Sequence, residues 1–255
     1  MHALRLMSLL AICLALLLFP QVSSAAQVDA QTRAFTPEQR TEIVHIIREA
    51  LKSDPSILRD GVTTLQADEN RKQADATRAA IDKVRLALTD TPSDPVTGNL
   101  QGEKTLVEFY DLQCPYCRRM LPVIHELVIA EPKLRIVYKD IPIEGSGSEF
   151  GARAVLAAQK QGGYLQLQEA IMNGPAEITE QSVQAATNQV GLDWARLRRD
   201  MDDPSIQARI DANLALSKSL GVQGTPTYVV GGTMFSGAMS LPQFQSAIDT
   251  AWALR

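Results

Sequence analysis

Two cysteines separated by two residues stand where an apolar run gives way to a helical pattern, in LVEFYDLQCPYCRRMLP, residues 106–122. The run from Thr105 to Asp111 is typical of a buried strand, and the stretch from Pro115 to Ala130 has helical periodicity. Cys114 therefore lies at a strand-to-helix junction. This junction constrains the fold strongly, because a buried strand must be followed directly by a helix whose first turn contains both thiols.

The start of a helix predicts an acidic thiol at Cys114. Unpaired backbone N–H groups and the positive end of the helix dipole stabilise a thiolate there, which lowers a cysteine pKa from about 8.5 to between about 3.5 and 7.5. Pro115 suits the first helical position, because the N–H that it lacks would have no partner in the helix. Cys117 follows one turn later on the same side. We therefore expect an exposed nucleophile at Cys114 and a deeper, resolving thiol at Cys117.

A metal site is the alternative, and the positions of the histidines bear on it. A closed zinc site needs about four ligands, but His125 lies eleven residues beyond Cys114 on the same helix, about 16 Å along its axis. His45 belongs to a separate helical segment near the start of the chain. We expect no zinc ion at the cysteine pair of one chain. Copper(I) held by the two thiolates, or a metal shared between subunits, stays open.

Residues 1–26 have the organisation of a cleaved secretory signal. One positive charge, Arg5, precedes an apolar run that is about half as long as a membrane-spanning helix requires, and small residues follow up to Ala25 and Ala26. We expect cleavage after Ala25 or Ala26 and export of the mature protein to the periplasm. Cys13 is removed with the signal in this interpretation, and its lipidation is the alternative.

Charge and cysteine content exclude two broad classes for the mature chain. Loss of Arg5 from the 25 basic residues leaves 24, against 29 acidic ones, and this mildly acidic balance does not suit a nucleic-acid partner. One cysteine pair cannot staple the roughly 230 residues that remain, so a disulfide scaffold is excluded as well. Because disulfides form in exported proteins, a single close-spaced pair there favours redox work.

Residues 27–90 are predicted to form a helical oligomerisation segment. Thr36 is a suitable N-cap, with Pro37 at the first helical position and Gln39 three residues after the cap, and Asp54 restarts a helix. The polar helix that follows gains little by folding alone, with an exposed spacer as the alternative. We expect copies of the chain to associate through an apolar stripe, which comprises Ile43, Ile46, Ile47, Leu51, Ile57 and Leu58.

The composition changes again at DTPSDPVTGN, residues 90–99, which has turn and linker chemistry throughout and predicts a domain boundary. Residues 91–255 then follow a β, α, β order, with a helical insertion at about 146–220 and two late strands before a final helix. Within this part GSGSEFG, residues 145–151, is interpreted as a flexible loop. The order of elements predicts a compact α/β domain interrupted by helices.

These motifs carry a family resemblance. CPYCRRMLP resembles the thioredoxin superfamily, and VEFYD before the cysteines together with GTPTYVVGG near the end resembles the bacterial disulfide-bond A (DsbA) family. Further upstream, FTPEQR and DPSIL are similar to the N-terminal region of ScsC-like proteins, which are tied to copper tolerance and commonly form trimers. The resemblance implies a thioredoxin fold with a helical insertion, preceded by an N-terminal helical oligomerisation segment.

The resemblance also implies roles for single residues. Thr225 and Pro226 would form a cis-proline loop that faces the cysteines and pairs with an extended substrate peptide, with an ordinary trans turn as the alternative. Glu108 would be a buried acid that takes the proton of the second thiol, unless it faces solvent. Pro115 and Tyr116, between the thiols, would tune the redox potential. No diffusible cofactor is implied.

Taken with the residues themselves, the resemblance predicts an exported thiol-disulfide oxidoreductase that acts on secreted or periplasmic proteins and is reset by a membrane redox partner. The N-terminal helices favour an oligomeric disulfide isomerase or reductase, most simply a trimer. A monomeric dithiol oxidase of the DsbA type is the first alternative. The alternative from another class is a non-catalytic copper-binding or holdase protein that uses the same thiols.

Overall fold

The computed structural model describes residues 35–253, which divide into two units at the junction of Asp68 and Glu69. The predicted signal, residues 1–26, lies outside the described residues, and so does Cys13. Helix α4, Ser56–Lys83, contributes residues to both units. Each unit is described by itself.

The N-terminal unit consists of helix α3, Pro37–Ser53, and the first part of α4. The predicted cap is confirmed: the Thr36 hydroxyl accepts from the Gln39 backbone N–H at 3.3 Å, and the Gln39 side chain accepts from the Thr36 N–H at 2.8 Å. This reciprocal pair satisfies two donors at the helix start. At the second helix, the Asp54 carboxylate accepts from the Ser56 N–H at 3.0 Å.

Helix α3 has no buried residue. Large apolar side chains just before α3 and on both helices of the N-terminal unit are exposed instead, namely Phe35, Ile43, Val44, Ile46, Ile47, Ile57, Leu58, Val62 and Leu65. Clusters of exposed apolar side chains often mark interaction surfaces. The exposed apolar surface is therefore in keeping with the predicted association, which stays a prediction.

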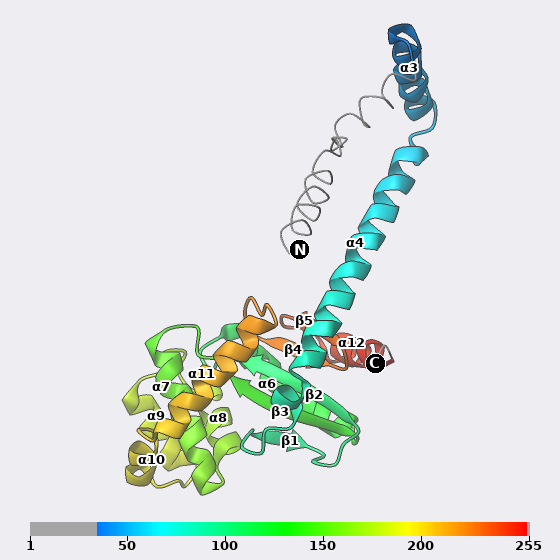
Figure 1. Cartoon of the computed structure of the whole chain (residues 1–255). Helices are drawn as coiled ribbons and strands as arrows, with labels where there is room; N and C mark the ends of the chain where they lie inside the picture. Colours follow the sequence, from blue (N-terminus) through cyan, green and yellow to red (C-terminus); the bar gives the residue numbers. More distant parts are fainter. Residues whose placement is uncertain (1–34, 254–255) are drawn as a thin grey trace, which may run out of the picture. The chain divides into compact units, whose positions relative to one another are not determined.

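The second unit is built on a five-stranded sheet with the order β1-β3-β2-β4-β5 (Figure 1). Strands β2 and β3 are parallel, and the other three pairings are antiparallel. The strands are β1 Val96–Gly98, β2 Lys104–Tyr110, β3 Leu134–Asp140, β4 Thr227–Val230 and β5 Thr233–Ser236. The mixed sheet with its parallel crossover is the predicted thioredoxin arrangement.

Helix α6, Pro115–Ala130, forms the crossover between β2 and β3, with the predicted bounds. The predicted insertion forms α7 Ser146–Ala158, the 3-10 turn η2 Gln159–Gln161, α8 Tyr164–Asn173, α9 Glu180–Gln189, α10 Trp194–Asp200 and α11 Pro204–Ser219. Figure 1 shows α7 to α10 grouped beside the sheet. Helix α12, Leu241–Ala253, ends the described chain.

Side chains alternate between the two faces of a strand, and both faces of the central strands are buried. One face, with Leu106 and Tyr110 of β2, packs with residues of α6, α8 and α12. The other face, with Val107 and Phe109, packs with residues of α4, α5 (Arg85–Thr89) and α11.

The predicted boundary near residue 90 differs from the observed division. Ile81 of α4 and Leu88 of α5 are buried in the same cluster as Phe109, so the end of the predicted N-terminal segment belongs to the core of the second unit. The burial of these two side chains explains how a mostly polar helix is stabilised at this position. The part of the segment that lacks a core of its own ends at Asp68.

The interpretation of residues 90–99 as linker throughout is wrong. Val96–Gly98 forms the edge strand β1, antiparallel to β3. Just before it, the buried carboxylate of Asp94 accepts from the Lys139 ammonium and, at 3.1 Å, from the Arg209 guanidinium. Lys139 also donates to the Ala87 carbonyl at 2.6 Å. A buried charge needs such partners, and they hold this segment on the sheet.

The interpretation of residues 145–151 as a loop is also wrong, because α7 begins at Ser146. A Cβ atom at Gly147 would lie 2.2 Å from the Gln113 side-chain oxygen, and one at Gly151 would lie 3.0 Å from Leu112 Cδ1. The glycines therefore allow α7 to approach the turn just before Cys114, and do not mark flexibility.

Within residues 35–253, no helix is both long enough and apolar enough to cross a membrane.

The Asp94 cluster gives a stability prediction. Asp94→Ala should lower the free energy of unfolding by about 3–5 kcal/mol, because it leaves the Lys139 charge buried without its carboxylate. The matched change Asp82→Ala removes an exposed pair with Arg85 and should cost less than about 1 kcal/mol. Urea unfolding at pH 7 compares the two variants. Equal losses would show that the buried cluster does not hold the fold.

Candidate active site

Cys114 is the N-cap of α6, and a fixed turn carries β2 into it. The Asp111 side chain accepts from the Gln113 N–H at 2.7 Å and from the N–H groups of Ile143 and Glu144 at 2.8 and 3.0 Å. The Cys114 N–H itself donates to the Asp111 carbonyl at 3.2 Å. One carboxylate therefore ties the turn before the cysteine to the segment that follows β3.

The loop before β4 lies against the first thiol. The peptide bond between Thr225 and Pro226 is cis, as predicted. The Cys114 thiol donates to the Thr225 carbonyl oxygen at 3.2 Å. Thr227 Oγ1 donates to the Gly224 carbonyl at 2.7 Å, which helps to hold the loop. Residues about 110 positions apart in the chain thus meet at one sulfur atom.

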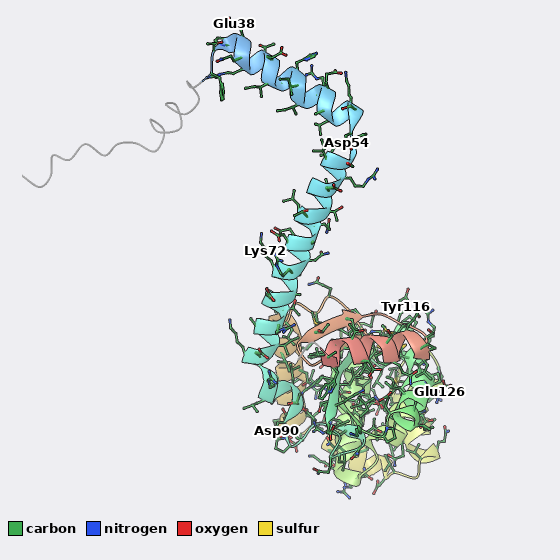
Figure 2. The ribbon with its side chains drawn as sticks, turned by 90° about the vertical axis from the view of Figure 1, so that its right-hand side faces the viewer. Glu38, Asp54, Lys72, Asp90, Tyr116 and Glu126 are labelled. Carbon is green, nitrogen blue, oxygen red and sulfur yellow. The ribbon has the colours of Figure 1, made fainter. Side chains whose placement is uncertain are left out.

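Cys117 is buried as predicted, but the prediction of an exposed Cys114 is wrong. Both are free cysteines and both are buried, with Cys114 2% exposed. The contact with Thr225 explains the difference, because the loop covers the sulfur. Pro115 and Tyr116 beside it are exposed, and Figure 2 labels Tyr116 on the second unit.

The two thiols have opposite electrostatic environments. A hydrogen bond from Cys117 is the main cause that lowers the pKa of Cys114 to about 6; the Thr225 side chain and the backbone N–H groups of Cys117 and Tyr116 add to it, against the effect of burial. The Thr225 hydroxyl is buried without another partner, so it is free to donate to a thiolate. Burial, the hydrogen bond to Cys114 and the charge of Glu108 raise the pKa of Cys117 far above its usual range.

Glu108 is buried in the sheet, as predicted, with 2% of its surface exposed. Its neighbours across the strands are Tyr138 of β3 and Tyr228 of β4. Burial raises the pKa of Glu108 to about 8; the Tyr228 hydroxyl opposes this, while the charges of Asp140 and Cys114 add to it. The Tyr228 hydroxyl has no regular hydrogen bond, so an ionised Glu108 has a donor available.

Arg118 is a part of the site that the sequence interpretation missed. Its guanidinium donates to the carbonyls of Leu112, Met172 and Gly174 at 3.0–3.1 Å, so it fastens the start of α6 to the turn before it and to the end of α8. Its position directly after Cys117 was the only signal in the sequence. Arg119, next along the helix, stacks over the Tyr116 ring at 4.5 Å.

Among residues 35–253, no three His, Cys, Asp or Glu side chains are grouped so as to hold a metal ion. His125 is exposed on α6. Copper(I) bound by the two thiolates alone stays a hypothesis.

Comparison with known proteins gives a consistent set of matches. Residues 105–249 match the family model of the DSBA-like thioredoxin domain. A thioredoxin-like oxidoreductase from Silicibacter pomeroyi is 42% identical, with a TM-score of 0.64 over 66% of this chain and 96% of that chain. Proteus mirabilis ScsC in a transitional conformation is 27% identical, with a TM-score of 0.64 over 88% of this chain and 99% of that chain.

A curated relative shows a partial match. The Na(+)/H(+) antiporter NhaA 3 of Salinispora tropica is 26% identical over 170 residues, which make up 66% of this chain and 26% of the antiporter. The chain thus spans about a quarter of the length of that relative.

The opposite environments of the thiols predict how they react with pH. Iodoacetamide should modify Cys114 of the reduced protein with a midpoint near pH 6, and should modify Cys117 slowly up to pH 9. Thr225→Val should move the Cys114 midpoint to higher pH, because it removes a group that favours the thiolate. Mass spectrometry of the labelled peptides follows each thiol separately. Midpoints near 8.5 for both thiols would contradict the assignment.

Proposed function

Because the chain belongs to the family of DSBA-like thioredoxin domains, we propose that it is an exported thiol-disulfide oxidoreductase that acts on proteins through Cys114 and Cys117. The observation that carries this proposal is the opposition between the two thiols. The pKa of Cys114 is lowered to about 6, whereas that of Cys117 is raised. A nucleophile that is ionised at neutral pH beside a thiol that stays protonated is the arrangement that thiol-disulfide exchange requires.

In the proposed reaction the Cys114 thiolate attacks one sulfur of a substrate disulfide. The substrate S–S bond breaks, a mixed disulfide forms, and the other substrate sulfur leaves as a thiolate. That thiolate can attack a different disulfide of the same substrate. The thiolate released from that second disulfide then attacks the mixed disulfide, which forms a new substrate disulfide and frees the Cys114 thiolate; this is isomerisation. Otherwise Cys117 attacks Cys114 Sγ, the mixed disulfide breaks, and the substrate leaves reduced while the pair is oxidised.

Glu108 is the proposed acceptor for the Cys117 proton. The Cys114 charge contributes to the raised pKa of Glu108, and this charge vanishes when Cys114 enters a mixed disulfide. The pKa of Glu108 then falls, so the carboxylate is available when Cys117 has to lose its proton. A positioned carboxylate can take this proton as general base, and no diffusible cofactor takes part in these steps.

The Thr225–Pro226 loop is the proposed binding edge for the substrate. The Thr225 carbonyl already lies 3.2 Å from Cys114 Sγ, so an extended peptide pairing with this backbone would bring its own sulfur to Cys114. Such a peptide must displace the contact that buries Cys114. Pro115 and Tyr116, exposed beside the sulfur, would line the same approach and influence the redox potential.

We favour isomerase or reductase work over oxidation because of the N-terminal unit. Its exposed apolar side chains on α3 and α4 would be covered if copies associate, most simply as a trimer. Several Cys114 sites would then face one substrate, which suits the reshuffling of wrong disulfides and is unnecessary for simple oxidation. A membrane redox partner would keep the pair reduced. The signal-like pattern of residues 1–26 supports the proposal that this work is done in the periplasm.

The proposed roles of the thiols predict distinct variants. Cys114→Ala should abolish the reactivation of scrambled ribonuclease, because no nucleophile remains. Cys117→Ala should accumulate mixed disulfides with the substrate, because nothing within the site resolves them. Non-reducing electrophoresis after acid quenching detects these adducts. Turnover by Cys114→Ala would contradict the role of Cys114, whereas no turnover by the unaltered protein would favour the non-catalytic alternative, in which the thiols hold copper or a client.

The N-terminal unit predicts a link between assembly and activity. Deletion of residues 27–68 should leave a folded monomer that still reduces a small disulfide but isomerises scrambled ribonuclease at least about tenfold more slowly, because sites no longer converge on one substrate. Sedimentation at micromolar concentration measures the assembly.

Two point variants on α3 sharpen this test. Ile47→Gln removes an exposed apolar side chain and should weaken association, whereas Glu49→Gln places the same side chain two residues away and should not. A full-length protein that sediments as a monomer would refute the association and favour the monomeric oxidase.

A further inference from the structure

Another buried carboxylate lies close enough to Glu108 for its charge to act on it. Asp140, at the end of β3, is 2% exposed. The Tyr110 hydroxyl donates to its Oδ1 at 2.7 Å, and the Tyr164 hydroxyl donates to its Oδ2 at 2.9 Å. The two hydroxyl oxygens are themselves 2.6 Å apart. The Tyr164 hydroxyl also lies 3.0 Å from Asp140 Oδ1. Asp140, Tyr110 and Tyr164 therefore form a closed ring in which each residue contacts the other two, which we call the Asp140 ring.

The hydrogen bonds of the Asp140 ring can accommodate one proton more than the ring carries when Asp140 is ionised. With Asp140 ionised, two hydroxyl protons serve the three contacts between the residues, so one contact lacks a hydrogen. With Asp140 protonated, three protons serve the three contacts, and each of the three residues both donates and accepts. Such a ring stabilises the carboxylate through two donors and can also take up a proton without leaving a group unpaired.

The Asp140 ring lies on the same face of the sheet as Glu108. Tyr110 pairs with Asp140 across β2 and β3, and Glu108 pairs with Tyr138 two residues earlier on the same two strands. Because side chains two residues apart share a face, Glu108 and Asp140 are near neighbours. The Tyr138 ring, across from Glu108, packs on those of Tyr110 and Tyr164, with centroids 5.7 and 6.2 Å away.

The groups that face Asp140 come from three elements. Strand β2 supplies Tyr110 and Glu108, α8 supplies Tyr164, and α11 supplies the charge of Arg209. The Asn213 amide of α11 donates to the Asp140 backbone carbonyl at 3.2 Å.

These groups oppose the effect of burial only in part. Burial raises the pKa of Asp140 to about 6, while the two tyrosines and Arg209 oppose the rise. Both carboxyl groups therefore change charge within about two pH units of neutrality, and each charge disfavours the other.

We propose that Glu108 and Asp140 form a coupled pair that holds one proton between them, so that the Asp140 ring is protonated when Glu108 is ionised and ionised when Glu108 is protonated. Asp140 is a positioning residue in this scheme, because it acts on Cys117 through Glu108. The proposal rests on the proposed function, in which Glu108 receives the Cys117 proton.

The proton balance of the step follows from the pair. In the resting protein the shared proton lies on Glu108. When Cys114 enters the mixed disulfide, loss of its charge lowers the pKa of Glu108, so in the proposed step the proton moves to the Asp140 ring and Glu108 is ionised before Cys117 attacks. As Cys117 forms its bond to Cys114 Sγ, its proton moves to Glu108, the substrate sulfur leaves with the electrons of the broken S–S bond, and Asp140 gives up a proton. One negative charge stays buried throughout. Tyr164 lines a surface cavity of about 240 Å³ beside Gln159 and Asp94.

Two variants separate this coupling from ordinary packing. Asp140→Asn keeps the shape and removes the charge, so the pKa of Glu108 should fall by about one unit. Tyr164→Phe removes one donor to the Asp140 carboxylate, which favours its neutral form, so Glu108 should shift in the same direction by less. In the Asp140→Asn background, Tyr164→Phe should cause no further shift. Glu126→Gln, an acid-to-amide change at an exposed position of α6 labelled in Figure 2, is the control.

The first measurement is a pH titration of the reduced full-length protein by NMR, with ¹³C in the carboxyl groups of Asp and Glu. Glu108 and Asp140 are assigned from Glu108→Gln and Asp140→Asn. In the unaltered protein each resonance should titrate in two coupled steps. An unchanged Glu108 midpoint in Asp140→Asn would overturn the proposal, and if that variant does not fold, an unchanged midpoint in Tyr164→Phe would overturn it equally.

The second measurement follows the resolving step with oxidised glutathione as the probe. Reduced protein is mixed with excess probe, quenched in acid, and the decay of the Cys114–glutathione adduct is measured by mass spectrometry as a function of pH. The acid limb of this rate should move to lower pH by about one unit in Asp140→Asn, and should not move in Glu126→Gln. If the unaltered protein forms no adduct at all, the proposed function fails, while the NMR titration still decides on the proton sharing.

Discussion

The site depends on a sulfur atom at the cap position of α6. Helix starts are usually capped by an oxygen side chain that accepts from the first backbone N–H groups. Cys114 has the extended cap conformation, with φ −63° and ψ 121°, but its thiol makes no such bond. The N–H groups of Tyr116 and Cys117 therefore remain available for a thiolate, and they contribute to the lowered pKa of Cys114. Ionisation of the thiol completes the cap.

The surrounding structure keeps the other ionisable groups in the opposite state. Cys117 and Glu108 are buried between α6 and the sheet, where the charged form is costly, so both retain protons to a higher pH than usual. Arg118 and the glycines of α7 hold the turn before Cys114 in place. The site therefore combines an ionised nucleophile, Cys114, at the helix start with two protonated groups, Cys117 and Glu108, beneath it. The proton that must be moved in the resolving step is held by these buried groups and not by the nucleophile.

The sequence predicts this arrangement where the signals are local. Pro115 and the apolar run before the cysteines locate α6 and β2 correctly, and glycine and proline breaks locate the helices of the insertion. The cis bond at Pro226 came from the family resemblance, since nothing in the residues alone distinguishes it from a trans turn. The errors concern contacts between residues that are distant in the sequence. Asp94 binds partners 45 and 115 positions away, and the Asp140 ring joins residues from three elements. Neither set of contacts produces a periodic signal in the sequence from which it could be predicted.

The reduction potential of the Cys114–Cys117 pair, measured by equilibration with glutathione, tests the central claim most directly. A thiolate stabilised at the helix start favours the reduced form and so makes the disulfide more oxidising. The account predicts a potential more positive than the roughly −270 mV of thioredoxin, and a shift to a more negative value in Thr225→Val. A potential below about −300 mV, which is typical of structural disulfides, would contradict it.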